Sequence, residues 1–274
     1  MLLEAKYFYD ISYGKIDVTA GKMISLWHDA REIGMELNTN GEYGDIPNGE
    51  ELEESIKHKG WDKIIIDDEN NTVFITDPYV SLDVGSVAKG YATQRVAEYL
   101  VTENVKNAVI DAGGNLKALS GKYNGKEWLT GIRNPKNPSL SPDDSLLTVQ
   151  YSGDKSAVTS GDYERAFIAK DGKLYSHIID PDTTYPADKY RSVTIITTDA
   201  GVADCLSTAL FCLDYEDGLK VIEQYKKDHD NAFLEVVWVA NKDINFETGN
   251  IYHTKSFNIA YTQGLRGKIN IIND

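Results

Sequence analysis

The pattern of hydrophobic and polar positions predicts a chain that begins with helices and continues with mixed strands and helices. The first thirty residues are predicted to be mainly helical. Residues 38–48, rich in Gly, Asn and Asp, are predicted to form a loop before a second helix at 49–59. Further along, apolar residues recur at helical spacing, which predicts an amphipathic helix that is followed by another at 216–225. The residues of that apolar face are Val202, Leu206, Ala209, Leu210 and Leu213.

Short apolar runs bounded by turn residues predict the strands. We expect strands at 63–67, 73–76, 107–111, 116–119, 128–132, 146–151, 192–197, 233–239 and 251–257, and a hairpin whose tip lies at 170–173. The runs between residues 107 and 151 are predicted to form a meander. Because strands and helices are mixed without strict alternation, the predicted fold class is α+β.

Charge and composition narrow the range of functions. The formal net charge is −15, and affinity for DNA or RNA depends on Lys and Arg side chains, so the sequence argues against a nucleic-acid partner. A phosphate-bearing ligand would need a metal ion or a local basic residue at its site. No apolar run is long enough to cross a bilayer, and the first ten residues lack the basic start and apolar core of a secretory signal. Cys205 and Cys212 lie two turns apart on one predicted helix, too far apart to form a disulfide.

A predicted strand at 79–83 ends in a glycine-bearing turn that leads into a helix. Asp83, Ser86 and Lys89 occupy this turn and the first helical residues. A helix N-terminus directs main-chain N–H groups at an anion, and Lys89 adds positive charge, so the segment is a candidate phosphate or metal site. The alternative is an ordinary connection between a strand and a helix, in which Gly85 eases the turn.

Asp204 and Thr208 are spaced four residues apart on the predicted helix, so both oxygen-bearing side chains lie on one helical face. Mg²⁺ takes oxygen ligands and often uses only one or two carboxylates, with waters and substrate phosphates completing its shell. This pair is therefore a candidate Mg²⁺ site. The alternative is an Asp that the helix dipole favours and a Thr that bonds back to a carbonyl.

His177 stands between Ser176 and Asp180, where a predicted strand ends before a turn. Of the five His residues, it alone lies in a run of turn-forming and polar residues. Imidazole can act as a general base near neutral pH without much tuning. The alternative is a half-buried structural histidine. Residues 159–163 are predicted to form a polar turn, which either cradles a ligand or is only a turn.

Six motifs, in this order along the chain, resemble those of the ApbE family of FAD:protein FMN transferases. They are GKIDVTAG from Gly14 with the later Leu26-Trp27, DVGSVAKGYA from Asp83, DAGGN from Asp111, TSGDYER from Thr159, YSHIIDP from Tyr175 and ADCLSTAL from Ala203. Together they span almost the whole chain.

The resemblance implies an ApbE-type fold of mostly antiparallel sheets flanked by helices, with residues 1–274 as one flavin transferase domain. It also implies Mg²⁺-dependent transfer of FMN from FAD to a threonine hydroxyl of an acceptor flavoprotein, with AMP leaving. By position, Ser86 (through its carbonyl), Asp204 and Thr208 would hold the metal, and His177 would take the proton from the acceptor threonine. The implied FAD contacts are Lys15, Ile16, Asp17, Asp83, Lys89 and Ile179.

The chain also departs from the family pattern. The family usually has more sequence before the motif at Gly14, so we expect this chain to lack the family's N-terminal segment and its FAD contacts. Gln94 stands where the family commonly has Asp, and Thr184 replaces a Gly. The alternatives to the transferase are a Mg²⁺-dependent FAD pyrophosphatase, which releases FMN and AMP, and a catalytically inactive FAD-binding protein. The family resemblance implies an extracytoplasmic location and membrane association only through a tether that this sequence does not show.

Overall fold

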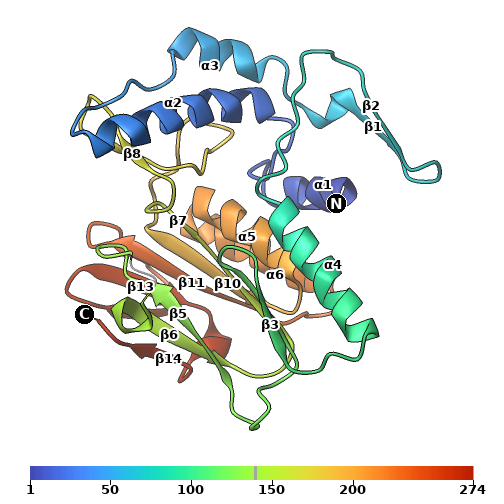
Figure 1. Cartoon of the computed structure of the whole chain (residues 1–274), viewed down its shortest axis with the longest axis vertical. Coiled ribbons are helices and arrows are strands. Elements are labelled where there is room, and N and C mark those ends of the chain that lie inside the picture. Colours follow the sequence, from blue (N-terminus) through green and yellow to red (C-terminus); the bar gives the residue numbers. More distant parts are fainter. Residues whose placement is uncertain (139–140, 274) are drawn as a thin grey trace. The chain divides into compact units, whose positions relative to one another are not determined.

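The computed structural model describes residues 1–138 and 141–273, and its contacts divide the chain into two compact units. Unit 1 comprises Met1–Ser86 and Glu164–Ala187, and unit 2 comprises Val87–Tyr163 and Asp188–Asp274. Figure 1 labels most helices and strands of both units. Within the described part of the chain, no helix combines the length and the hydrophobicity that a bilayer span requires.

Unit 1 is mainly helical. Its elements are α1 (Leu2–Ile11), α2 (Gly21–Thr39), α3 (Gly49–Ile56), the 3₁₀ turn η1 (Trp61–Lys63), the hairpin β1 (Ile64–Asp67) and β2 (Thr72–Ile75), and the short hairpin β8 (Phe167–Ile168) and β9 (Leu174–Tyr175). Met23 and Trp27 of α2 pack with Leu52 of α3 and with Phe167 in one buried cluster. A Cβ at Gly34 of α2 would lie 2.2 Å from Phe167 Cδ2, so this helix can pack on β8 only with glycine at that position.

Unit 2 is built on a seven-stranded antiparallel sheet in the order β12-β13-β11-β10-β7-β4-β3 and a three-stranded sheet in the order β14-β6-β5. The strands are β3 (Ala108–Asp111), β4 (Asn115–Leu119), β5 (Trp128–Arg133), β6 (Ser145–Tyr151), β7 (Lys155–Gly161), β10 (Ser192–Thr197), β11 (Leu234–Asn241), β12 (Asn250–His253), β13 (Phe257–Tyr261) and β14 (Ile269–Ile271). The helices are α4 (Ala88–Thr102), α5 (Ala200–Cys212) and α6 (Tyr215–Asp228), with 3₁₀ turns η2 (Pro142–Asp144) and η3 (Gln263–Leu265).

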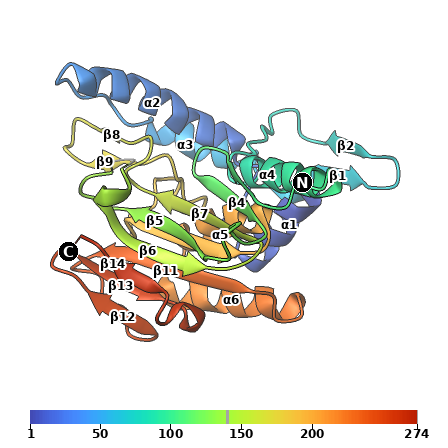
Figure 2. The ribbon, with the colours of Figure 1, turned by 60° about the horizontal axis from the view of Figure 1, so that its bottom comes forward.

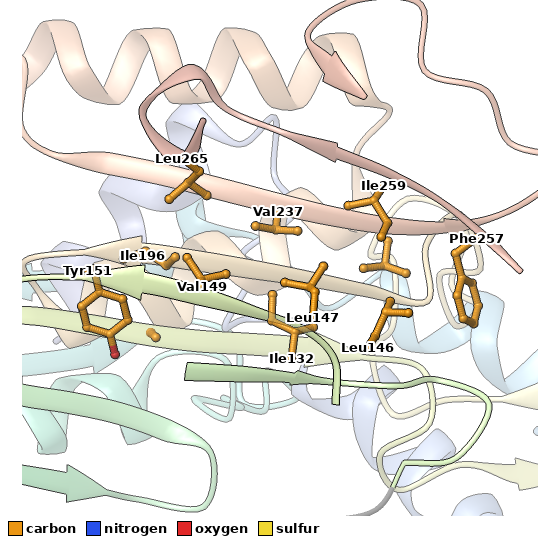
Figure 3. Close-up of a cluster of buried hydrophobic side chains, with 12 residues drawn as sticks. Ile132, Leu146, Leu147, Val149, Tyr151, Ile196, Val237, Phe257, Ile259 and Leu265 are labelled. Atoms are coloured by element: carbon orange, nitrogen blue, oxygen red, sulfur yellow. The ribbon is translucent and has the colours of Figure 1, made fainter. Parts of the chain in front are cut away.

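The core of unit 2 lies between its two sheets, which Figure 2 shows beside each other. Buried Ile196 and Val237 of the larger sheet pack with Leu147 and Val149 of β6, as Figure 3 shows. Side chains alternate across a strand, so neighbouring residues of the larger sheet face the other way. That second face carries α5, which contacts β4, β7 and β10, and α4 packs beside α5 (Figure 1).

The structure confirms the predicted α+β class, the helical start of the chain, the helices after residues 49, 86, 200 and 215, and the hairpin at 170–173. Cys205 and Cys212 both lie on α5 as buried free thiols, as their spacing predicts. The division into two units shows only that the contacts cluster in this way, and the interpretation of residues 1–274 as one transferase domain stays a prediction.

Several strand predictions were wrong. Residues 79–83 form no strand. Gly21 N–H donates to Ser81 O and Asp83 N–H donates to Val18 O, but these two hydrogen bonds make only an isolated bridge between Ala20 and Ser81. The predicted strand at 251–257 is two strands, β12 and β13, that pair with each other. The strands between residues 107 and 151 form no meander, because β3 and β4 join the larger sheet while β5 and β6 join the smaller one.

The predicted polar turn at 159–163 was also wrong in part. Residues up to Gly161 belong to β7, a central strand that pairs with β10 on one side and β4 on the other. Its Ser and Thr side chains resemble a loop in composition. They are accommodated because Thr159 Oγ1 lies 2.8 Å from Thr194 Oγ1 and Ser160 Oγ donates to Ser207 Oγ at 2.9 Å. Polar residues in a central strand thus pair with polar neighbours.

Candidate active site

In unit 2, the carboxylate of Asp204 is buried at the N-terminus of a neighbouring helix. The residue is only 3% exposed, and its Oδ2 accepts a hydrogen bond of 2.8 Å from the main-chain N–H of Gly90, in the first turn of α4. The side chain of Asp199 caps α5 itself, by accepting from Gly201 N and Val202 N. Asp204 therefore does not cap its own helix, and it stabilises the positive end of α4 instead.

Close packing of α4 on α5 makes this contact possible. A Cβ at Gly90 would lie 2.3 Å from Ala200 O and 2.5 Å from Asp204 Cβ. Only glycine lets the α4 backbone approach the carboxylate to hydrogen-bond distance. The packing of α4 on α5 within unit 2 therefore explains the glycine of the Lys89-Gly90 pair in the motif at Asp83.

The environment of Asp204 favours the neutral acid. Burial raises its pKa, and the Lys89 ammonium, the Gly90 N–H and the Asn115 amide act in the opposite direction without cancelling that effect. Lys89 Nζ lies 3.8 Å from Asp204 Oδ1, but the Lys89 side chain is half exposed, so water screens this pair. A buried carboxylate held in this way gains from a bound cation.

Hydroxyl groups surround the same turn of α5. Ser160 Oγ on β7 lies 3.4 Å from Thr208 Oγ1 and donates to Ser207 Oγ, which in turn donates to the carbonyl of Asp204 at 2.9 Å. One carboxylate with hydroxyl and carbonyl oxygens is a donor set that fits Mg²⁺, which keeps several waters and binds few carboxylates. No group of three or more His, Cys, Asp or Glu side chains that could hold a metal occurs in residues 1–138 and 141–273.

In unit 1, Lys15 connects two motifs that are far apart in the sequence. Its Nζ donates to Asp180 Oδ1 at 2.6 Å and to Asp182 Oδ2 at 2.7 Å. Burial acts to lower the pKa of Lys15, but the hydrogen bonds to both carboxylates outweigh it and raise the pKa. The ammonium therefore stays charged and fixes the Gly14 motif against the motif that contains His177.

Asp17 lies at the edge of a small pocket in unit 1. Its Oδ1 accepts from both the N–H and the hydroxyl of Thr19, and its Oδ2 is 3.9 Å from Lys59 Nζ. The pocket has a volume of about 220 Å³ and is lined by Tyr9, Asp10, Tyr13, Gly14, Asp17, Lys59 and Asp182. Two aromatic rings and one ammonium beside carboxylates give a surface that can take a ring bearing hydrogen-bond donors.

His177 is held by a main-chain carbonyl. Its Nδ1 lies 2.9 Å from the carbonyl oxygen of Glu164, which can only accept, so Nδ1 carries the proton and donates. In the neutral ring this leaves Nε2 as the acceptor nitrogen. The tautomer is the one that a general base requires.

The other predicted site residues of unit 1 are placed by main-chain contacts. Asp83 Oδ1 accepts from Gly85 N at 2.8 Å, and Ser86 is the last residue of the unit, two residues before α4 begins. Ile16 is fully buried, and Ile179 is part of the buried cluster around Trp27. The roles of all these residues toward FAD or Mg²⁺ stay predictions.

Thr184, which replaces a family glycine, has φ of +63° in the left-handed region, where a β-branched residue is strained. Its N–H donates to Asp180 O at 2.9 Å, and its carbonyl accepts from Trp27 Nε1 at 2.7 Å. The turn thus has a conformation that favours glycine, with threonine at this position.

The sequence did not single out three residues that the structure brings to these places. Lys59 and Asp182 line the pocket beside Asp17, and Asn115 lies buried near Asp204. Asp182 follows the Asp-Pro pair of a quoted motif, and Asn115 ends another, so both carried a signal. Lys59 lies in a stretch of several lysines and carried none.

Comparison with known proteins identifies the family. Residues 1–233 match the sequence profile of the ApbE family. The chain belongs to the ApbE family. Its relatives include the FAD:protein FMN transferase of Klebsiella pneumoniae, 32% identical over 229 residues, which are 83% of this chain and 64% of the relative. The enzyme of the same name from Haemophilus influenzae is 32% identical over 227 residues, 82% of this chain and 62% of the relative. The chain thus spans just under two thirds of the length of these relatives.

Solved structures of ApbE proteins share the fold. A variant of the flavin transferase ApbE from Vibrio cholerae superimposes with a TM-score of 0.72 at 26% identity, over 97% of this chain and 74% of that one. The ApbE protein of Thermotoga maritima gives a TM-score of 0.67 at 33% identity, over 85% of this chain and 70% of that one. These comparisons confirm the predicted ApbE-type fold.

Proposed function

We propose that this ApbE-family protein transfers FMN from FAD to the threonine hydroxyl of an acceptor flavoprotein, with Mg²⁺ as cofactor and AMP as the second product. The name FAD:protein FMN transferase, carried by the relatives from Klebsiella pneumoniae and Haemophilus influenzae, supports flavin transfer from FAD. The Mg²⁺ requirement, the threonine acceptor and the release of AMP are our proposal for this chain.

The observation that carries the proposal is the buried carboxylate of Asp204. It lies in a protein of net charge −15, beside hydroxyl groups, and its one ion-pair partner given by the structure, Lys89, is half exposed. A ligand with two phosphates adds negative charge to such a place, and a divalent cation resolves that conflict. Asp204, Thr208 and the carbonyl of Ser86 are the residues that we assign to the metal.

The reaction balances without a further reactant. The threonine oxygen forms a bond to the phosphorus of the FMN half of FAD, the bond from that phosphorus to the AMP oxygen breaks, and AMP leaves. The hydroxyl proton goes to His177 Nε2, the acceptor nitrogen of the neutral ring that Glu164 O orients. Bound Mg²⁺ would supply neutralisation of the pyrophosphate charge.

We assign recognition of FAD in unit 1 to Lys15, Ile16, Asp17, Asp83 and Ile179, and in unit 2 to Lys89. The 220 Å³ pocket beside Asp17 supports this assignment, because its aromatic and charged lining suits part of a flavin nucleotide. The 3.9 Å approach of Lys59 to Asp17 leaves an ammonium in that lining. We add Lys59 to the residues expected to affect FAD affinity.

The test is a product analysis with FAD and Mg²⁺, with and without an acceptor protein that carries a threonine flavinylation motif. The proposal expects acceptor-bound FMN and an equal amount of AMP, and neither product without Mg²⁺. AMP and free FMN formed equally well without acceptor would identify a pyrophosphatase instead. FAD binding with no AMP under any condition would identify an inactive flavin-binding protein.

The proposal includes an extracytoplasmic location with membrane association, since the resemblance to the family implies it. Fractionation of cells that express the full-length gene product, with detection by an antibody to this chain, tests it. Recovery of the protein in the cytoplasmic fraction would contradict this part and leave the proposed reaction standing.

A further inference from the structure

Asn115, the first residue of β4, is a buried amide without a well-formed hydrogen bond. The residue is 0% exposed, and neither its Oδ1 nor its Nδ2 has a hydrogen-bond partner. Burying an unpaired polar atom costs about 1–3 kcal/mol, so such groups are rare unless something else uses them. Asn115 carries two of these atoms on one side chain.

The sheet register places Asn115 on the face that carries α5. Asn115 is paired with Val158 of β7, and Ser160 lies two residues further on the same face. Ser160 contacts Ser207 and Thr208 of α5, and α5 packs against β4 itself. Asn115 thus belongs to the layer between the sheet and the turn of α5 that bears Asp204.

The amide of Asn115 interacts with the carboxylate of Asp204. The interaction is not a regular hydrogen bond, because neither amide atom of Asn115 has a hydrogen-bond partner. Asp204 Oδ2 already accepts from Gly90 N, so one further donor would define the plane of the carboxylate. Ligands of a metal ion are commonly oriented by such outer hydrogen bonds.

We propose that Asn115 is a positioning residue for Asp204, whose carboxylate its amide N–H holds in the orientation that binds Mg²⁺. The inference rests on the proposed metal role of Asp204 and extends it to a residue on a different element. It also explains the unpaired amide, which is kept for the metal-bound state at the expense of stability in the free protein.

The test separates metal affinity from stability. Asn115→Leu keeps the branching at Cγ but has no polar atoms, so it removes both unpaired groups, and the variant is expected to be at least as stable to urea as the unaltered chain. Its Mg²⁺ affinity, measured by calorimetric titration of MgCl₂ without FAD, is expected to be 10–100-fold weaker, the usual effect of removing an outer-shell partner. Asn115→Ala is titrated in parallel in case the larger side chain prevents folding.

Ser156→Ala is the matched control. Ser156 is fully buried on the same face of the sheet, and its hydroxyl donates to Leu116 O at 2.6 Å. Loss of this hydrogen bond is expected to lower stability while leaving the affinity for Mg²⁺ unchanged. Asn115→Leu is therefore expected to weaken Mg²⁺ binding without loss of stability, and Ser156→Ala to lower stability without loss of Mg²⁺ binding.

Equal Mg²⁺ affinity of the unaltered chain and of a folded Asn115 variant would overturn the inference while leaving the proposed metal site intact. Lower stability of Asn115→Leu together with unchanged Mg²⁺ binding by Asn115→Ala would also overturn the inference. That result would mean that the Asn115 amide stabilises the fold and does not position Asp204. Failure of the unaltered chain to bind Mg²⁺ would overturn the proposed metal site and this inference with it.

Discussion

Replacement of Gly90 by alanine tests the packing that supports Asp204. A Cβ at this position would lie 2.3 Å from Ala200 O, 2.5 Å from Asp204 Cβ and 2.9 Å from Gly201 Cα. Two of these atoms belong to the backbone of α5, so no side-chain rotation relieves the clash. The helices α4 and α5 would have to separate, and the hydrogen bond from Gly90 N to Asp204 would stretch or break.

Opposing effects decide whether Gly90→Ala raises or lowers the free energy of unfolding. Alanine in a helix is more favourable than glycine by about 1 kcal/mol. Overpacking of this kind costs roughly 1–3 kcal/mol, and a hydrogen bond to a charged group contributes roughly 1.5–3 kcal/mol. The free energy of unfolding should therefore fall by roughly 1.5–5 kcal/mol. We also expect weaker Mg²⁺ binding, since Asp204 loses the donor that fixes it.

Urea unfolding followed by circular dichroism measures the change, and Gly218→Ala on α6 is the control. A Cβ at Gly218 would meet only Leu210 Cδ2 at 3.4 Å and Trp238 Cζ2 at 3.8 Å, which are ordinary contacts. This variant should gain stability, by up to about 1 kcal/mol, from helix propensity alone. If Gly90→Ala were as stable as Gly218→Ala, the close-packing argument would be refuted.

Four further predictions concern single residues. Asp204→Asn should abolish Mg²⁺ binding in calorimetry without loss of stability, because burial already favours a neutral group there; intact binding would exclude Asp204 as a ligand. His177→Ala should lower turnover by roughly 10²–10⁴-fold, with partial recovery at high pH and unchanged FAD affinity; weaker FAD binding with normal turnover at saturation would assign it to binding. Burial raises the pKa of Asp162 against the opposing effect of Arg191, so its contribution to stability is present below the unfolded pKa and is lost as pH rises through the higher folded value. Urea titrations of the unaltered chain between pH 4 and 8 should show a free energy of unfolding that declines with pH, and Asp162→Asn should remove part of that decline. The same pH dependence in both proteins would contradict the prediction. Thr184→Gly should stabilise unit 1 by up to about 1.5 kcal/mol in urea, because relief of left-handed strain (about 1–2 kcal/mol) exceeds the added entropy of glycine (about 0.5–1 kcal/mol).

Local patterns in the sequence predicted the helices and the placement of some candidate site residues on them. The spacing of Asp204 and Thr208 places both on one face of α5, because four residues are about one helical turn. His177 stood out in the same way, as a histidine in a run of turn-forming and polar residues. The resemblance to a family then linked these fragments, and the profile match over residues 1–233 confirms the family.

Contacts set by strand pairing could not be predicted in this way. β7 was missed because its Ser and Thr residues resemble a loop, and they are tolerated only through partners on β10 and α5. The same pairing decides that Asn115 and Ser160 share a face, since a shift of one residue in the register of β4 would turn Asn115 to the other side. Such a register depends on segments more than forty residues apart.

Thr184 shows how the two kinds of information complement each other. By its resemblance to the family motif, the sequence has a threonine at a position where the family has glycine, the residue that a left-handed turn favours. The structure shows that Thr184 has φ of +63° and hydrogen bonds to Trp27 and Asp180. The strain of a left-handed threonine is thus tolerated beside Lys15 and Asp180, the ion pair that joins the two motifs of unit 1. The geometry of this turn is therefore maintained by its neighbours rather than by its own residue type, and the same neighbours fix the segment that carries His177.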